Sequence, residues 1–504
     1  MRVINQRFVD FLEGNDKHFV VPVYQRNYDW GKGHCKRLFD DIVQIFKKNF
    51  NNHFLGTIVS IYDEKSEKRE YLIIDGQQRI TTISILLLAL YQLLDKNEIS
   101  SEINKQEIKE GYLVSKYSLK GEKRIKLKPV KDDNLAFTKL FENENEHIPD
   151  SNITNNYNYF KKLIKEIDIS VDDFYRSIKK LIVVEIELIR GEDDPQLIFE
   201  SLNSTGLSLK ESDKVRNFIL MGQPNLTEQV RLYDSYWNKI EKNTKNYEDN
   251  FIRDYLTYKE RDIPNKDKIY EFFKNFVKKS YSDKIEDLLK EMLTFSEYYN
   301  RIVLSKDEDP DINILLERIN NLEISVSYPF LLEVFDDYEN NILKKEELIE
   351  ILNTIESFTF RRLITDLPTN ALNKIFMTLG REIKKITDYE SNYLDIFKYI
   401  LSSKKGSQKF PTEEEFSERI VNRDIYHLRS KNVTHLLERL ENFDNSEKVK
   451  VEELIRDKIL TIEHIMPQNL TKSWMTSLGD NFHQIHEKWL HTLGNITLTG
   501  YNSK

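Results

Sequence analysis

The chain has 504 residues, which is too long for one hydrophobic core and predicts about two to four domains. Hydrophobic residues make up 39% and charged residues 32%, a balance that excludes an intrinsically disordered protein. Only 15 glycines and 11 prolines favour a largely helical fold, and a net charge of −9 excludes a globally basic surface. Contact with nucleic acid would therefore need a local basic patch.

Nothing in the sequence predicts export or membrane insertion. The longest apolar run, residues 83–90, is well short of the ~20 residues that a membrane span needs. The N-terminus lacks the apolar core of a signal peptide, and Cys35 is the only cysteine, so no internal disulfide can form. We expect a cytoplasmic protein that has no membrane partner.

Residues 19–30, FVVPVYQRNYDW, begin as a strand and continue into an aromatic loop. One interpretation is a base- or phosphate-binding loop, where an aromatic ring stacks and Arg26 reaches an anion. The alternative is a loop packed on the core, with Arg26 stacked on a ring. A helix at 36–46 and an apolar strand at 53–63 follow, so this region predicts a small mixed α/β unit.

Residues 71–94 predict a strand, a tight turn and a buried helix. The β-branched run at 71–74 is broken by Asp75 and Gly76, and from about Arg79 an apolar helical pattern continues. This arrangement suits a phosphate: a helix N-terminus offers unpaired N–H groups, Arg79 can fork onto phosphate oxygens, and Asp75 can hold a cation or orient water. In the structural alternative Asp75 caps the helix and pairs with Arg79.

Residues 116–129 predict a hairpin arm with a basic outer face that carries Arg124, Lys126 and Lys128. This face would either contact nucleic acid or form a solvated edge strand.

Residues 181–221 predict a strand at 181–188, a helix at 195–202, a turn at 203–206 and a further helix. These elements are either a well-capped helix pair or bring Asn203, Asp213, Arg216 and Asn217 to the pocket of Asp75.

Four stretches together resemble the N-terminal domain of the GmrSD-type restriction proteins: VPVYQRNYDW, HFLGTIV, IIDGQQRITT and IFESLNSTGLSLKESDKVRN. The resemblance implies a ParB/sulfiredoxin-like α/β fold and binding of an NTP, GTP or another, with hydrolysis at the DGQQR motif. Asp75 and Arg79 would then be catalytic. The nucleotide-binding residues would be Tyr24, Gln25, Arg26, Gly76, Gln77, Gln78, Thr81, Asn203, Asp213 and Arg216.

The C-terminal region has the outline of a His-Me finger (HNH-type) nuclease, because a strand ending in Glu463-His464 is followed by LGNITL. The words EHIMPQ and LGN also resemble the GmrSD nuclease domain. His464 would be the general base, Glu463 a ligand of a divalent metal such as Mg²⁺, and Asn495 would orient the imidazole or brace the loop. The alternative is a buried histidine satisfied by Asn495 in a structural ββ unit.

Three further histidines, His483, His486 and His491, could suggest zinc, but with a single cysteine we set zinc aside. In the family the finger closes with a helix that carries another asparagine ligand. The chain stops at Lys504, so we expect an incomplete nuclease domain in which Asn502 is a candidate metal ligand, and its cleavage activity stays open.

The sequence as a whole predicts an α+β, predominantly helical fold in three parts: a nucleotide-binding domain at 1–222, a helical connector at 223–415 and a ββα-type (HNH) nuclease domain at 416–504. The predicted function is a modification-dependent (type IV-like) restriction or anti-phage endonuclease that acts on modified or phage DNA under NTP control. The alternatives are a non-cleaving, nucleotide-responsive sensor or scaffold that binds DNA or protein, and a stand-alone NTPase. The oligomeric state stays open.

Overall fold

The computed structural model describes residues 1–63, 69–115, 125–203, 209–223, 225–445 and 448–500. The chain divides into two compact units, Met1–Trp237 and Asn238–Lys504. The predicted α+β, predominantly helical fold is confirmed. None of the helices in the described ranges combines the length and the apolar character that a bilayer crossing requires.

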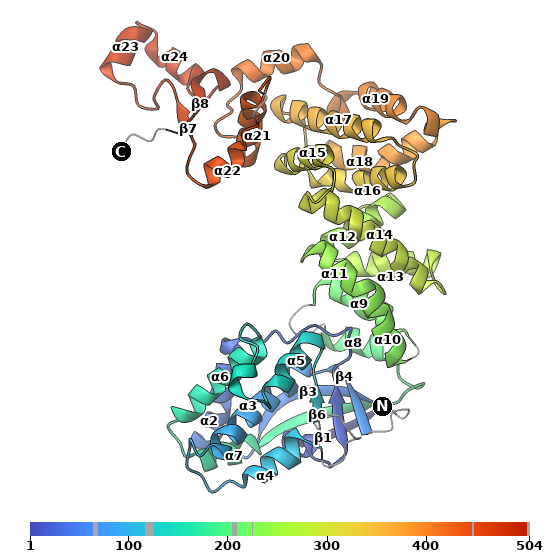
Figure 1. The fold of residues 1–504 in the computed structure, drawn as a ribbon, viewed down its shortest axis with the longest axis vertical. Coiled ribbons are helices and arrows are strands. Elements are labelled where there is room, and N and C mark those ends of the chain that lie inside the picture. Colours follow the sequence, from blue (N-terminus) through green and yellow to red (C-terminus); the bar gives the residue numbers. More distant parts are fainter. Residues whose placement is uncertain (64–68, 116–124, 204–208, 224, 446–447, 501–504) are drawn as a thin grey trace. The chain divides into compact units, whose positions relative to one another are not determined.

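The first unit is built on one six-stranded mixed sheet (Figure 1). The strand order is β1-β6-β3-β4-β2-β5; β1 with β6 and β3 with β4 are antiparallel, and the other neighbours are parallel. Its elements are β1 (Arg2–Arg7), α1 (Phe8–Leu12), β2 (Lys17–Val20), α2 (Lys32–Lys47), β3 (His53–Asp63), β4 (Arg69–Asp75), α3 (Gln77–Asp95), α4 (Lys105–Ile108), β5 (Leu127–Lys128), α5 (Lys131–Lys139), α6 (Asn152–Lys165), α7 (Val171–Ile178), β6 (Leu181–Leu188), α8 (Pro195–Asn203), α9 (Glu211–Met221) and α10 (Leu226–Leu232).

Strand β4 is buried on both faces, which explains its uninterrupted apolar run. Tyr71 and Ile73 belong to the main core, which α3 also forms. Leu72 points to the other face of the sheet and shares a pocket with Met221 of α9. Both faces of such a strand contact apolar groups, so apolar and polar residues need not alternate and its sequence is a continuous apolar segment.

The predicted basic outer face of the 116–129 arm is wrong at Lys126. This side chain is only 1% exposed. Its Nζ donates to the carbonyl oxygens of Leu12 (2.9 Å) and Gly111 (2.5 Å), so it links the end of α1 to the segment before β5. The alternation of the sequence cannot reveal these carbonyls, because distant segments supply them. Arg124 lies outside the described residues.

The second unit is helical except for one strand pair (Figure 1). Its elements are α11 (Asn238–Thr244), α12 (Glu248–Glu260), α13 (Ile269–Ser280), α14 (Ile285–Leu304), α15 (Pro310–Asn321), α16 (Tyr328–Glu339), α17 (Lys345–Ile364), α18 (Asn370–Lys384), α19 (Tyr393–Ser403), α20 (Glu413–Asn422), α21 (Ser430–Glu441), α22 (Val451–Arg456), β7 (Thr461–His464), α23 (Lys472–Leu478), α24 (Phe482–Trp489) and β8 (Ile496–Thr499).

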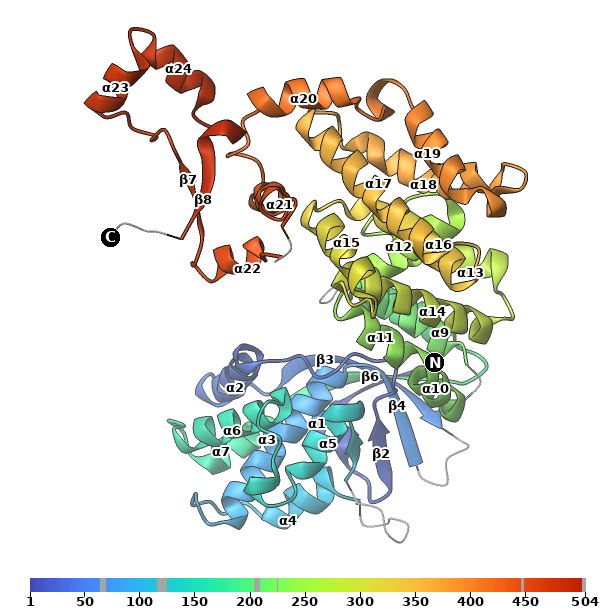
Figure 2. The ribbon, with the colours of Figure 1, turned by 45° about the horizontal axis from the view of Figure 1, so that its top comes forward.

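The antiparallel pair β7–β8 packs on a small core of its own (Figure 2). Ile496 of β8 joins Leu436 and Leu437 of α21 and Ile364 at the end of α17 in this cluster. The cluster therefore ties the last 90 or so residues to the helices before them. The three-part division at residues 222 and 415 remains a proposal.

Candidate functional site

The turn between β4 and α3 is fixed by Gly76. Its φ is +89°, a left-handed value that favours glycine. A Cβ at this position would lie 3.0 Å from both the Thr57 carbonyl oxygen and Ile58 Cγ1. Helix α3 then begins without a side-chain cap, as a phosphate-binding helix terminus would.

Asp75 and Arg79 flank this turn, and they do not form the pair that the structural alternative required. Within the described ranges, the Asp75 carboxylate makes no hydrogen bond or ion pair, and it does not cap α3. Arg79 Nη1 instead donates to the Thr57 carbonyl oxygen at 3.3 Å. The guanidinium lies against Gly56, where an added Cβ would come within 2.7 Å of Arg79 Nε. Both charged groups therefore remain available to a ligand.

Gln78 holds the aromatic loop in place. Its Oε1 accepts from the backbone N–H groups of Asp29 (2.9 Å) and Trp30 (3.3 Å), and its Nε2 donates to the Asn27 carbonyl oxygen (3.1 Å). Gln77 donates to Gln25 Oε1 at 3.2 Å. The two glutamines thus fasten the loop to the start of α3, a role that the resemblance to nucleotide-binding residues did not predict.

A small cavity collects part of the predicted nucleotide set. Arg26, Gln77, Gln78 and Thr81 line it together with Asp133. Sequence reasoning missed Asp133, because no local motif surrounds it.

Burial raises the pKa of Asp133 to about 6, although the hydrogen bond that its Oδ2 accepts from Tyr28 N (2.6 Å) opposes the shift. This carboxyl is therefore partly protonated near neutral pH.

The other predicted members do not line this cavity, but Gln25 adjoins it, because its Nε2 donates to the Ile74 carbonyl oxygen at 2.8 Å beside Asp75. Arg216 is 9% exposed; its Nε donates to the Tyr24 carbonyl oxygen (2.9 Å) and its Nη2 pairs with Asp213 (2.7 Å). These contacts hold α9 against the chain near Tyr24, which is itself buried. The side chain of Asn203 lies outside the described residues.

In the second unit, His464 is the last residue of β7 and pairs with Ile496 of β8. Asn495 does not contact its imidazole. The Asn495 side chain instead accepts from Met466 N (2.6 Å) and donates to the carbonyl oxygens of Met466 (3.1 Å) and Leu490 (2.8 Å). The asparagine therefore braces the loop that follows β7.

The His464 ring is held by other groups. Its Nε2 lies 3.2 Å from His491 Nδ1, and its Nδ1 lies 3.3 Å from the Gln468 amide nitrogen. The ring of Tyr426 packs at 4.3 Å between centroids. Burial, and then the neighbouring His491, lower the pKa of His464. The ring is accordingly a neutral imidazole near neutral pH, with Nδ1 toward the exposed side chain of Gln468.

The carboxylate of Asp424 contacts a third histidine, His427, which packs against His491. His427 lies 4.4 Å from His491 between ring centroids, and its Nδ1 is 2.8 Å from Asp424 Oδ2. Although burial opposes it, the hydrogen bonds from His427 lower the pKa of Asp424. Sequence reasoning missed Asp424 and His427, and the only available signal was that six of the ten histidines lie in the last 80 residues.

Two domain models of known proteins match the chain. The model of the GmrSD restriction endonuclease N-terminal domain matches residues 8–220, and the model of the GmrSD restriction endonuclease C-terminal domain matches residues 410–504. These segments cover more than half of the chain and contain both candidate sites. The chain belongs to the GmrSD restriction endonuclease family. GmrSD membership makes it a modification-dependent restriction endonuclease whose substrate is DNA. No match to the chain was found among curated proteins.

The described residues do not complete a metal site in the GmrSD nuclease domain. No group of three or more histidine, cysteine or acidic side chains in the described ranges could hold an ion. Glu463 is exposed and accepts from Thr461 Oγ1 at 3.2 Å, on the strand face opposite His464. Asn502 lies outside the described residues. Near His464, the imidazole nitrogens of His464 and His491 are the side-chain groups that could bind an ion.

Proposed function

We propose that His464 is the general base of the nuclease and that nucleotide bound at the β4–α3 turn controls cleavage. The observation that carries the proposal is the setting of the His464 ring: Nε2 is engaged by His491 at 3.2 Å, while Nδ1 faces an exposed amide. A water that replaces this amide can give its proton to Nδ1 as it attacks a phosphodiester. The substrate in this proposal is modified or phage DNA, and cleavage depends on a divalent metal such as Mg²⁺.

The nucleotide part of the proposal is supported by the β4–α3 turn. An uncapped helix N-terminus, the Asp75 carboxylate and the Arg79 guanidinium all belong to the turn at the C-terminal end of β4, an interior strand of the sheet. Together they offer N–H donors and a cation to phosphate oxygens, and a carboxylate to a bound cation or water. The nucleotide is GTP or another NTP. It switches the nuclease because the nucleotide before hydrolysis and the product after it bind two states of the protein with different affinities.

Cleavage tests the first part. The full chain is incubated with Mg²⁺, each NTP in turn, and a panel of plasmid and phage DNAs with modified or unmodified bases. We expect nicking or cutting of modified DNA, with a loss of about 100-fold or more in His464→Ala. His483→Ala is the matched control, because His483 is exposed on α24 and contacts neither His464 nor Asn495. Equal cutting by wild type and His464→Ala would contradict the assignment.

Turnover tests the second part. Phosphate release from each NTP is measured for wild type, Asp75→Ala and Arg79→Ala, with circular dichroism to verify folding. We expect both variants to lose binding or hydrolysis, whereas Arg37→Ala, an exposed arginine of α2, keeps it. If neither substitution alters turnover, the turn is a structural element. Nucleotide binding without any DNA cleavage would favour the sensor or scaffold function.

A further inference from the structure

The hydrogen bonds around the His464 ring fix which of its two nitrogens carries the proton. The side-chain amide nitrogen of Gln468 lies 3.3 Å from Nδ1 and can only donate, so Nδ1 is the acceptor. A neutral imidazole carries one proton, which is therefore on Nε2. Nε2 donates this proton to His491 Nδ1, which lies 3.2 Å away. The nitrogen on the exposed side is thus bare, while the opposite nitrogen has an acceptor.

His491 is itself held by the segment 424–427. Its carbonyl oxygen accepts from the backbone N–H groups of Ile425 (2.8 Å) and Tyr426 (3.3 Å). The Tyr426 ring stacks on the His491 ring, with centroids 5.5 Å apart and an angle of 19° between the two planes. The ring of His427 meets His491 nearly edge-on, with centroids 4.4 Å apart and an angle of 68°. The backbone and the ring of His491 therefore both have a defined position.

Asp424 fixes the conformation of this segment. Its Oδ1 accepts from the backbone N–H of His427 at 3.0 Å, and its Oδ2 accepts from His427 Nδ1 at 2.8 Å. Both side chains are exposed, so this pair contributes less to the site than the contact between His491 and His464. A continuous series of contacts nevertheless leads from the carboxylate through two histidines to the His464 ring.

The orientation of His464 needs a residue other than Asn495, which contacts only the backbone of the loop. We propose that His491 is the positioning residue of the nuclease: it accepts the Nε2 proton of His464 and so keeps Nδ1 bare and directed at the attacking water. This role rests on the proposed function of His464 as the general base. Tyr426 and His427 act one step further away, because they hold His491.

Cleavage by the full chain separates positioning of the base from binding of DNA. His491→Ala should lower kcat about 10–100-fold and leave KM for DNA unchanged, since the His491 ring contacts His464 and not the substrate. His491→Asn should recover most of the rate, because its Oδ1 takes the place of Nδ1 and accepts the same proton. His427→Ala should have a smaller effect than His491→Ala, since the His427 side chain is exposed.

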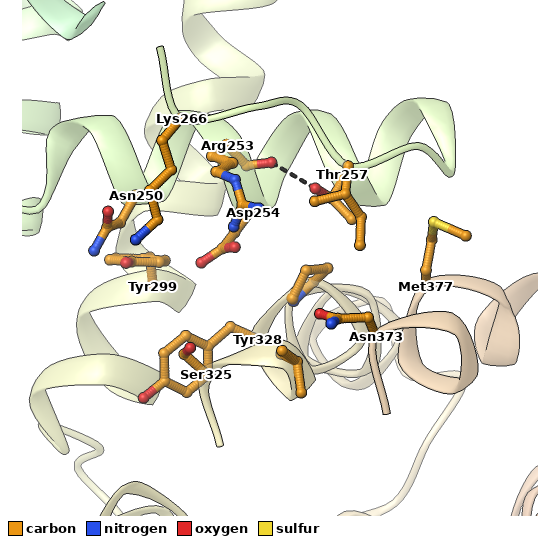
Figure 3. A pocket seen from close by; sticks show the side chains of 13 residues that line it. Asn250, Arg253, Asp254, Thr257, Lys266, Tyr299, Ser325, Tyr328, Asn373 and Met377 are labelled. Atoms are coloured by element: carbon orange, nitrogen blue, oxygen red, sulfur yellow. Dashed lines mark hydrogen bonds between the residues drawn. The ribbon is translucent and has the colours of Figure 1, made fainter. Parts of the chain in front are cut away.

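Asp254→Asn is the control for a substitution elsewhere in the second unit. Asp254 belongs to α12, and its side chain points into a separate cavity of about 100 Å³ among α12, α14, α16 and α18 (Figure 3). This cavity shares no lining residue with the groups around His464. The variant should therefore cut DNA as wild type does.

NMR of the full chain with isotope-labelled histidine tests the contact without cleavage. The Nε2-bound proton of His464, identified by its loss in His464→Ala, should be observable because its hydrogen bond slows exchange with water. The signal should disappear in His491→Ala, return in His491→Asn and persist in Asp254→Asn. A signal that is unchanged in His491→Ala would overturn the inference, whether or not the chain cuts DNA.

The two experiments also distinguish this inference from the assignment of the base. If His464→Ala loses cleavage while His491→Ala cuts as wild type does, the base stands and the positioning role of His491 is refuted. If cleavage does not depend on His464, the assignment of the base fails, and the NMR signal alone decides whether His491 holds the ring. Loss of activity in His491→Ala without recovery in His491→Asn would also contradict the role, because the acceptor is then not what matters.

Discussion

Asn495 illustrates how one side chain can support a site without touching its reactive group. The sequence left two roles open for it, orienting the His464 imidazole or bracing the loop. In the structure its amide contacts the backbone of Met466 and Leu490, while His491 and Gln468 meet the imidazole. The position of His464 thus depends on a loop that Asn495 holds closed.

Asn495→Ala should therefore act on stability. The substitution leaves Met466 N and two carbonyl oxygens without partners in a buried place, at a cost of about 1–3 kcal/mol. The free energy of unfolding of the Asn238–Lys504 unit, measured in urea on the full chain, should fall by this amount. Asn481→Ala is the control, because Asn481 is exposed and gives no side-chain cap to α24, so a change within about 0.5 kcal/mol is expected. Equal losses in both variants would contradict the bracing role.

The residues around His464 also mark the limit of sequence reasoning. His464 and Asn495 were identified from short motifs, because each motif is local. Asp424, His427 and His491 join the site only through the fold, since Ile425 N donates to the His491 carbonyl oxygen at 2.8 Å and so brings the two segments together. No spacing in the sequence encodes that contact.

At the scale of elements, the sequence predicted correctly the strands and helices that depend on local residue patterns. The strand at 181–188 and the strand–turn–helix at 71–94 follow from β-branched runs, a glycine turn and an apolar helix, and all are present. The arm at 116–129 went wrong because tertiary contacts decided it: Lys126, the middle basic residue, is bound by carbonyl groups of α1 and of the segment before β5. Alternation predicts a face, whereas burial depends on what covers that face.

The packing of α21 on α17 places His435 beside Glu356, with Nε2 and Oε1 3.4 Å apart. Burial, and then Arg439, lower the pKa of His435 to about 4. An unfolded histidine titrates near 6.5, so between these values the unfolded chain binds the proton and the folded chain does not. Stability is then lost as the pH falls.

Between pH 7 and pH 5 the free energy of unfolding of the wild type should fall by about 1–2 kcal/mol more than that of His435→Gln, because only the wild type carries this titration. Urea unfolding at the two pH values measures the difference. The exposed His483 supplies the control: His483→Gln should follow the wild-type curve. The same change in unfolding free energy with pH for wild type and His435→Gln would mean that the folded histidine keeps an ordinary pKa.

At the scale of the whole molecule, the chain consists of two compact units that meet in sequence at Trp237 and Asn238. Composition predicted several domains because a chain of this length exceeds one core, but it could not place the boundary, since helices run continuously on both sides. Each unit has buried apolar clusters of its own, so each can unfold as a cooperative body.

Calorimetry of the full chain should therefore show two unfolding transitions. Asn495→Ala lowers only the one that belongs to Asn238–Lys504, which assigns it. A bound NTP at about 100 times its dissociation constant stabilises the unit that holds it by about 2.7 kcal/mol. If the β4–α3 turn is the nucleotide site, this ligand raises the transition of Met1–Trp237 by roughly 5–10 °C and leaves the other in place. In Arg79→Ala the shift should vanish although the transition itself persists. A shift of the Asn238–Lys504 transition alone would place the nucleotide in the second unit and remove the turn from the mechanism.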